Sequence, residues 1–504
     1  MIPAGGKVSS GGSRAWAWRV FATCWLVYTL FWTPYIVREH FPALALAERG
    51  SLNVDRYLGW TEDIFAGPKG GAYINNNPGA SLAGALPLLL LRPVLVRVDG
   101  WNQKLPRPRL TMTHDDEEFF WRILAEGRVL YFLFVAFVTV AMVMAPATAG
   151  TAAYLCSRLT EAGLPAASAA KVAILYGLGT PVLFRAGHLN HNLLVGDAGI
   201  TALLLLWDPE DRPLHPARAT GAGLLAGYAV LCDYSGAVVA AITALYVWLR
   251  SAGQPGMRRL GVMGAYVGGV LPGVAALAIY QAWAFGSLYL PSQQFMPATA
   301  PTSRGYRGLD WPSPRLMWAN FFDAHFGLFA YCPALILAFA APFATRVRYR
   351  VPAREMRILL TYFVLFVLFC AANQYSWLQP KTGFRYLVPV VPALAVLAMQ
   401  AAQALPRVVR WVVASATCAQ SLIMAVGHQN TFMLSLSSLW QRRLALPWMM
   451  RLGDAGVPVT WVWTLVTYVL LALAVRLIWL APGLWKRRHA RRGAADSCHP
   501  AAGA

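Results

Sequence analysis

Charged residues are scarce in this chain. Asp, Glu, Lys and Arg make up 13% of its 504 residues, whereas 57% are hydrophobic. An ordinary soluble protein has about 25% charged and about 45–50% apolar residues. Too few charged side chains remain to cover the surface of a soluble fold of this length, so the composition indicates an integral membrane protein.

Several chemical signatures are missing from the sequence. The seven cysteines form no CxxC pair, and six of them lie within or at the ends of apolar segments, so neither a disulfide framework nor a zinc site is indicated. There is no GxxxxGKS or GxxxxGKT motif that would bind nucleotide phosphates. There is also no internal repeat and no pair of broken helices in corresponding halves, which counts against a secondary transporter.

Acidic residues are especially few. The chain has 22 acidic and 43 basic residues, and its formal net charge is +21. A nucleic-acid-binding protein would gather this charge on one soluble face. Here the basic residues separate apolar runs instead, as expected for cytoplasmic loops beside anionic lipid. We therefore expect a lipid bilayer, and no nucleic acid, as a partner.

Apolar runs of a length suited to membrane spans recur along the chain. A bilayer core of about 30 Å takes about 20 residues of helix. The clear runs cover residues 17–36, 129–157, 167–184, 189–207, 260–285, 326–345, 358–374, 386–404, 411–427 and 459–482. The first is too long for a signal peptide and lacks a small-residue cleavage site, so we expect it to remain as an uncleaved span.

Two regions can be interpreted in more than one way. Residues 79–97 are apolar but contain Pro87, Arg92 and Pro93, which suits a helix lying in the membrane interface as well as one that crosses. Residues 220–250 form either one kinked helix or two helices folded at the Asp-Tyr-Ser-Gly sequence.

The distribution of basic residues among the loops distinguishes these interpretations. If residues 79–97 do not cross and residues 220–250 cross twice, twelve spans result and every short basic loop falls on one side of the membrane. The opposite choice also gives twelve spans but moves Arg158, Arg212 and Arg218 outside. The positive-inside rule favours the first choice. The fold class expected is an all-α, polytopic membrane protein of about twelve transmembrane helices with both termini cytoplasmic and a large first exterior loop.

This topology divides the chain into six parts. They are a cytoplasmic N-terminus with the first span (1–36), an exterior catalytic loop with interfacial helices (37–127), a core transmembrane module (128–285), a second exterior loop (286–325), a C-terminal transmembrane module (326–482) and a basic cytoplasmic tail (483–504). Two pairs of glycines four residues apart, Gly223 with Gly227 and Gly264 with Gly268, are typical of close helix packing.

The first exterior loop carries the carboxylates that could do chemistry. Glu39 lies directly beyond the first span, Asp55 follows it, and Asp63 precedes a turn rich in Gly, Asn and Pro. A carboxylate that is partly desolvated at a membrane surface has a raised pKa, which suits a general base.

The order of these features resembles that of the GT-C class of glycosyltransferases, which use polyprenyl-phosphate sugars and include protein O-mannosyltransferases and the lipid A aminoarabinose transferase. Four segments are similar to motifs of a bacterial branch of the class: AERGSL at 47–52, AYINNNPGASL at 72–82 with Tyr73, LLAGYAVLCDYSG at 224–236, and TGFRYLVP at 382–389. One departure is Asn76, where the branch usually has Lys.

The resemblance implies a GT-C fold with an exterior active site, an acidic residue just past the first span, and a polyprenyl-phosphate-linked sugar as donor. Departure of a phosphate also requires positive charge, because the leaving group is an anion. Arg385 and Lys381, in an exterior loop that enters a span, fit the role of donor-phosphate-binding residues.

Three further residues are candidates for the site. His188 and His191 lie at an exterior boundary between spans, where an ionisable side chain suggests function. Their spacing would suit a divalent metal, but two ligands alone do not define a zinc site, and contact with phosphate or acceptor is the alternative. Asp233 lies at the tip of an apolar hairpin, where a charge is costly.

The function expected is that of a glycosyltransferase of the cell inner membrane. It would move a sugar from the donor to an envelope glycan, lipid or protein acceptor on the exterior face, in one displacement that inverts the anomeric centre. An alternative is a carrier or flippase for lipid-linked sugars, which needs no exterior base and is therefore distinguished by Glu39 and Asp63. A catalytically inactive structural subunit is a third reading.

Overall fold

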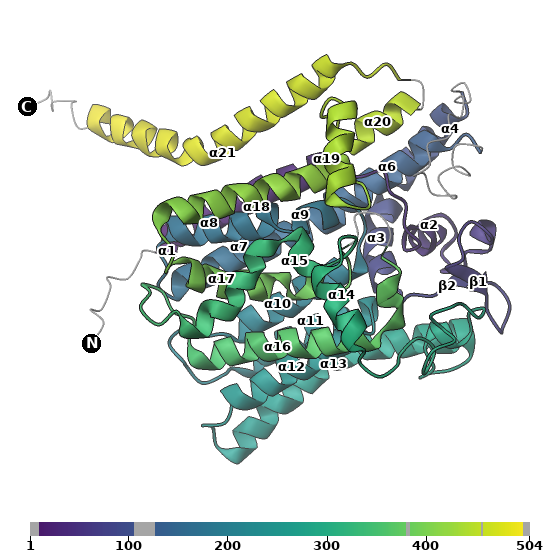
Figure 1. Ribbon diagram of the computed structural model, residues 1–504, viewed down its shortest axis with the longest axis horizontal. Helices are drawn as coiled ribbons and strands as arrows, with labels where there is room; N and C mark the ends of the chain where they lie inside the picture. Colours follow the sequence, from purple (N-terminus) through teal and green to yellow (C-terminus); the bar gives the residue numbers. More distant parts are fainter. Residues whose placement is uncertain (1–9, 105–125, 380–383, 455–456, 497–504) are drawn as a thin grey trace, which may run out of the picture.

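The computed structural model describes residues 10–104, 126–379, 384–454 and 457–496, whose regular secondary structure is helical except for one short hairpin (Figure 1). The N-terminal part contains α1 (Ser10–Leu30), α2 (His40–Arg49), the hairpin β1 (Ile64–Ala66) and β2 (Ala72–Ile74), α3 (Gly79–Leu90), α4 (Arg92–Asn102), α6 (Val129–Thr139) and α7 (Ala145–Glu161). The middle part contains α8 (Ala166–Gly179), α9 (Val182–Arg185), α10 (His191–Leu206), α11 (Pro216–Cys232), α12 (Gly236–Arg250) and α13 (Gly256–Phe285).

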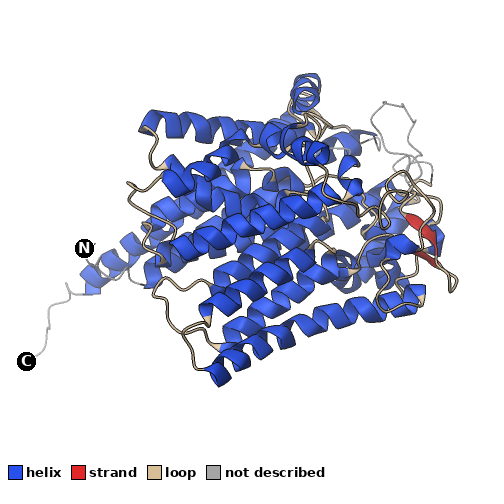
Figure 2. Ribbon diagram, turned by 60° about the horizontal axis from the view of Figure 1, so that its bottom comes forward, coloured by secondary structure: helices blue, strands red, loops and turns tan. Residues whose placement is uncertain are grey.

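The C-terminal part continues this pattern of helices. It contains α14 (Pro314–Phe322), α15 (Leu328–Tyr331), a 3-10 segment (Pro333–Phe343), α16 (Ala353–Ala372), α17 (Val391–Ala402), α18 (Arg407–Gly427), α19 (Phe432–Gln441), α20 (Pro447–Asp454) and α21 (Trp461–Asp496). Most of the longer helices lie alongside one another, and the antiparallel strands project at one end of them (Figures 1 and 2).

Within the described residues, five helices are long and apolar enough to cross a membrane. They are Val129–Glu161, Gly256–Phe285, Ala353–Ala372, Arg407–Gly427 and Trp461–Leu480. Five other apolar helices have 10–17 residues. Each clear apolar run of the sequence overlaps a helical segment, which supports a membrane protein. The number of twelve spans stays a prediction, because the shorter helices fall below the roughly 20 residues that a bilayer needs.

The two ambiguous regions adopt distinct shapes. Residues 79–97 fall in α3 and α4, which meet at an angle of 81° around Leu91. Pro93 has no backbone N–H to continue the hydrogen bonds of α3, so the helix breaks there. Residues 220–250 form two helices, α11 and α12, joined at an extended Asp233. Gly236 is required at this turn, because a Cβ there would lie 2.2 Å from the carbonyl carbon of Ala229.

Helices α11 and α13 pack through glycines. A Cβ on Gly223 would lie 2.2 Å from the carbonyl oxygen of Tyr266, and one on Gly273 would lie 2.1 Å from that of Gly227. The predicted packing role of Gly223 and Gly227 is therefore confirmed. The prediction for Gly264 and Gly268 is wrong, since a Cβ at either would meet no atom within 4 Å. The close approach on α13 is made instead by Gly269, where a Cβ would lie 2.3 Å from the carbonyl oxygen of Thr220, and by Gly273 four residues later.

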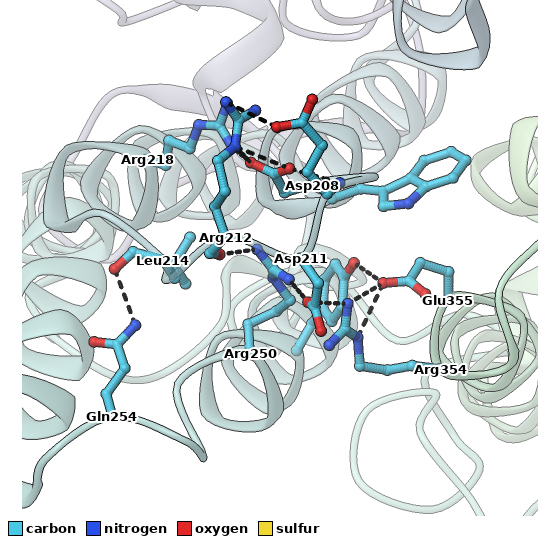
Figure 3. Close-up of polar contacts among 12 residues, drawn as sticks. Asp208, Asp211, Arg212, Leu214, Arg218, Arg250, Gln254, Arg354 and Glu355 are labelled. Atoms are coloured by element: carbon cyan, nitrogen blue, oxygen red, sulfur yellow. Dashed lines mark hydrogen bonds and ion pairs between the residues drawn. The ribbon is translucent and has the colours of Figure 1, made fainter. Parts of the chain in front are cut away.

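A network of charged side chains ties together the ends of three helices (Figure 3). Asp211 pairs with Arg250 at the end of α12 and with Arg354 at the start of α16, where the Arg354 Nη2 to Asp211 Oδ1 distance is 2.9 Å. Arg354 also pairs with Glu355 at 2.7 Å, and the Tyr246 hydroxyl donates to the same Glu355 oxygen. Helix α12 has 15 residues, so its first residue, Gly236, lies about 22 Å from Arg250 in this network.

The glycine contacts between α11 and α13 give a first testable expectation. Gly273→Ala should destabilise the protein by about 1–3 kcal/mol, because the added methyl group overpacks the backbone of α11. Gly268→Ala, on the same helix, is the matched control and should not lower the melting temperature, because open space surrounds it. Melting of the detergent-purified variants measures both. Equal melting temperatures would show that α11 and α13 do not pack as described.

Candidate functional site

A cleft of about 1210 Å³ opens where several loops converge. Its walls come from the segment after α1, from both flanks of the β1–β2 hairpin, from the α11–α12 turn, from the loop between α13 and α14, and from the segment between α16 and α17. Polar and aromatic lining residues include Tyr35, Arg38, Glu62, Asp63, Asn75, Asp233, Tyr289, Gln293, Arg307, Asp323, His325, Asn373, Tyr375, Trp377, Gln379, Arg385 and Tyr386.

Three of the residues predicted for the site line this cleft. Asp63, Asp233 and Arg385 are each separated by more than 150 positions in the sequence and are brought together by the fold. Lys381, the second predicted phosphate-binding residue, lies outside the described residues. The cleft thus contains carboxylates together with guanidinium groups, near the start of α12 and in the segment between α16 and α17.

Glu39 lies behind the cleft lining, with 2% of its surface exposed. Its Oε1 is 2.7 Å from His191 Nδ1, accepts a hydrogen bond of 2.6 Å from Asn76 Nδ2, and lies 3.4 Å from Arg38 Nε. Burial alone would raise the pKa of this carboxyl, but the charge and hydrogen bond of His191, helped by Arg38, lower the pKa well below its usual range. Glu39 is therefore an anion with three partners around its Oε1.

His191 stands between two carboxylates. Its Nδ1 contacts Glu39, and its Nε2 lies 3.8 Å from Asp233 Oδ2. The position is fixed by the start of α10, where the Asn190 side chain accepts a 3.0 Å hydrogen bond from Leu193 N and so caps the helix. Carboxylates are also favoured at a helix N-terminus by the positive end of its dipole.

Arg38 and Asp63 form the rim of the cleft next to this group. Arg38 Nη1 lies 2.8 Å from Asp63 Oδ2, and Asn75 Nδ2 donates to Asp63 Oδ1 at 2.7 Å. Burial lowers the pKa of Arg38, but the charges of Asp63 and Glu39 outweigh it and raise that pKa. The Asn75 carbonyl in turn accepts hydrogen bonds from side chains of the loop between α13 and α14. Arg38 thus links the buried and the exposed carboxylate.

Arg385, which lines the cleft, has a second, buried arginine near it. Arg385 donates to the Tyr386 hydroxyl at 2.8 Å and lies over its ring. Arg185 is 2% exposed, and its Nε donates to the Phe384 carbonyl. Burial and the neighbouring charge of Arg385 lower the pKa of Arg185 to about 9. Sequence reasoning missed Arg185; an arginine two residues before the GHLNH segment, at an expected span boundary, was the available signal.

The remaining predicted residues lie apart from the cleft. Asp55 is exposed and accepts a hydrogen bond from Ala72 N, which fixes the base of the hairpin. Tyr73 is buried against Trp283 and Phe285, with ring centroids 5.5 Å apart in both pairs. Both residues shape the loop that carries Asp63, and neither lines the cleft.

His188 does not act together with His191. It is 3% exposed, its Nε2 lies 3.2 Å from Asn190 Nδ2, and its ring packs edge-on against Tyr35. Within the part of the chain that the structure describes, no group of three or more His, Cys, Asp or Glu side chains is arranged to hold a metal ion. The two histidines therefore have separate surroundings.

Comparisons with known proteins add no assignment. No protein-family model, no curated protein and no solved structure matches this chain.

Two buried histidines beside the site give a pH-dependent expectation. Burial lowers the pKa of His40 to about 4 and that of His188 well below its ordinary value, with the charge of Arg185 also lowering the latter. The unfolded chain then binds more protons below a pH of about 6.5, so stability is full above that pH and is lost as the pH falls through it. As the pH falls from about 6.5 toward its pKa in the folded protein, each histidine lowers the free energy of unfolding by about 1.4 kcal/mol per pH unit.

The test is the slope of melting temperature against pH between 7.5 and 5. His188→Gln should flatten the slope, whereas His215→Gln, at an exposed position, should leave it unchanged. An equal slope in the wild type and His188→Gln would mean that His188 is not buried as a neutral group.

Proposed function

We propose that this protein is an integral membrane glycosyltransferase of the inner membrane that moves a sugar from a polyprenyl-phosphate donor to an envelope acceptor on the exterior face. The observation that carries the proposal is the convergence of Asp63, Asp233 and Arg385 on one cleft. Carboxylates and guanidinium groups are the two kinds of group that this reaction requires. The resemblance of four sequence segments to GT-C enzymes supports the same reading.

The reaction has one displacement step. An acceptor hydroxyl oxygen forms a bond to C1 of the sugar from the side opposite the phosphate, while the bond from C1 to the phosphate oxygen breaks and its electron pair stays with the polyprenyl phosphate. The hydroxyl proton goes to a carboxylate of the cleft, which acts as general base. Attack from the opposite side inverts the anomeric centre.

The paired arginines support binding of the donor phosphate. Burial first, and then the neighbouring charge of Arg385, lower the pKa of Arg185, so its charged form is disfavoured. A phosphate placed between them would relieve the repulsion between the two charges, and a guanidinium can hold two phosphate oxygens at once. This pair would meet the charge for which the GT-C branch uses a lysine where this chain has Asn76.

The size and lining of the cleft support a carbohydrate ligand. Its volume of about 1210 Å³ exceeds that of a small-molecule site of about 300–1,000 Å³, as expected where a donor and an acceptor bind together. The aromatic rings of Tyr289, Tyr375 and Trp377 offer flat apolar faces, and amides such as Gln293 and Asn373 can hydrogen-bond to hydroxyl groups.

In the proposed topology, the cleft faces the exterior of the inner membrane and the charged network around Asp211 faces the cytoplasm. Arg212, Arg218, Arg250 and Arg354 meet at the network end of the helices, which is the basic side that the positive-inside rule assigns to the cytoplasm. Both termini would then be cytoplasmic, and the first exterior loop would contribute Asp63 to the cleft.

Labelling of single cysteines tests this topology. Trp311→Cys, on the cleft side, should react with a membrane-impermeant thiol reagent in intact spheroplasts, and Glu210→Cys, at the network end, should react only after lysis. Both positions are exposed, so accessibility to solvent is matched. The unsubstituted protein gives the background, since its described cysteines are buried or nearly so. Labelling of Glu210→Cys before lysis would overturn the orientation.

Donor binding is tested at Arg385. Arg385→Lys keeps the charge but loses the bidentate contact, so the affinity of the purified protein in nanodiscs for undecaprenyl phosphate should fall about tenfold. Arg348→Lys, exposed between the 3-10 segment and α16, is the matched control and should bind as the wild type does. Cells that lack the native gene and carry Arg385→Lys should also show less of the envelope glycan, measured by mass spectrometry.

The same experiment separates the proposal from the alternatives. If deletion of the gene leaves the envelope glycan unchanged, the proposal that the protein is a glycosyltransferase is wrong. If Arg385→Lys binds undecaprenyl phosphate as the wild type does, Arg385 is not part of the phosphate-binding site. A carrier would require the protein for export of the lipid-linked sugar but would form no new glycosidic bond in reconstituted vesicles.

A further inference from the structure

The contacts of three carboxylates near the cleft decide which of them can accept a proton. Asp63 has both oxygens engaged, Oδ2 by Arg38 at 2.8 Å and Oδ1 by Asn75 at 2.7 Å. An acceptor hydroxyl would have to compete with these two partners. Asp63 is therefore suited to holding Arg38 at the rim of the cleft rather than to taking a proton.

Glu39 is even less available. It is 2% exposed and does not line the cleft, and its Oε1 is contacted by His191, Asn76 and Arg38. Removing one partner of a buried pair leaves the other charge buried without compensation, which is strongly destabilising. The energetic role of Glu39 is to hold its three partners in place.

Asp233 differs from both. It lines the cleft, and its Oδ1 accepts a 2.8 Å hydrogen bond from Ser235 N, which holds the carboxylate in the tight turn before Gly236. Its Oδ2 lies 3.8 Å from His191 Nε2, a distance too long for a hydrogen bond. A hydroxyl oxygen about 2.8 Å from both Asp233 Oδ2 and His191 Nε2 would form a hydrogen bond of normal length with each.

We propose that Asp233 is the carboxylate that accepts the acceptor's proton, and that the buried Glu39–His191 pair positions it. This inference rests on the proposed function and deepens it. Glu39, expected from the sequence to be the base, then has a positioning role. Glu39 fixes Nδ1 of the imidazole by a 2.7 Å contact, so that the ring presents Nε2 to Asp233.

The acceptor's hydroxyl proton moves once, to Asp233. As the acceptor oxygen bonds to C1 and the phosphate departs with its electron pair, the O–H bond of the acceptor breaks and its proton moves to Asp233 Oδ2. His191 Nε2 stands next to the same oxygen and fixes the direction from which the hydroxyl approaches. The carboxylic acid returns its proton to water after the products leave, and no oxidant, reductant or metal is needed.

The test compares transfer with donor binding in the same variants. Transfer is the rate at which the envelope glycan appears after induction in cells lacking the native gene, and binding is the affinity of the purified protein for undecaprenyl phosphate. Asp233→Asn should lower transfer by about 10²- to 10⁴-fold and leave binding unchanged. His191→Gln and Glu39→Gln should lower transfer by up to about 10²-fold, the size expected of a misplaced catalytic group. A structural defect alone would lower both quantities.

The double variant Glu39→Gln/Asp233→Asn should transfer no more slowly than Asp233→Asn alone, because Glu39 acts only through Asp233. Asp233→Ala should regain part of its transfer when formate is added to the medium, since formate supplies the missing carboxylate. Glu210→Gln and His215→Gln, both exposed and distant from the cleft, are matched controls for loss of a carboxylate and of an imidazole.

Each outcome bears on a different statement. If the wild type transfers and Asp233→Asn transfers equally well, the proposed function stands and the assignment of Asp233 falls. Losses that multiply in the double variant would show that Glu39 acts independently and would overturn its positioning role. If the wild type neither forms the glycan nor binds undecaprenyl phosphate, the proposed function fails and this inference fails with it.

Discussion

Burial of the Glu39 carboxylate forces the surrounding chain into one arrangement. An isolated charge away from water is too costly to persist, so the carboxylate needs partners, and it takes them from three separate segments: Arg38 beside it, Asn76 after the hairpin, and His191 at the start of α10. These contacts fix the first loop against the helices. The cleft depends on them, because Arg38 leads to Asp63 and His191 leads to Asp233.

Much of the fold was predictable from the sequence, because hydropathy and helix-breaking residues act locally. The apolar runs overlap helices, the Asp-Tyr-Ser-Gly sequence forms the turn between α11 and α12, and Pro93 marks the break after α3. The packing of α13 was not predictable in the same way. Spacing alone could not tell which glycines of that helix face α11, since the choice depends on how the two helices are rotated about their axes.

The candidate site was predictable only in part, for a related reason. Asp233 stood out because a charge at the tip of an apolar hairpin is costly, and Arg385 because it lies in an expected exterior loop that enters a span; both line the cleft. The sequence also singled out Glu39, but its withdrawal behind the cleft depends on a partner about 150 positions away. Arg185 was overlooked because nothing close to it in the sequence indicates that Arg385 stands beside it.

The charged contacts at the two ends of the helices differ in their exposure to water. The Glu39 side chain is 2% exposed, whereas the Asp211 side chain, which joins α12 to α16 at the other end, is 67% exposed. Dissolved ions screen exposed charges over about 10 Å at 0.1 M salt but act much less on buried pairs. Rising ionic strength will therefore weaken the contacts of Asp211 more than those of Glu39, while the buried hydrogen bond from Tyr246 to Glu355 still joins α12 to α16.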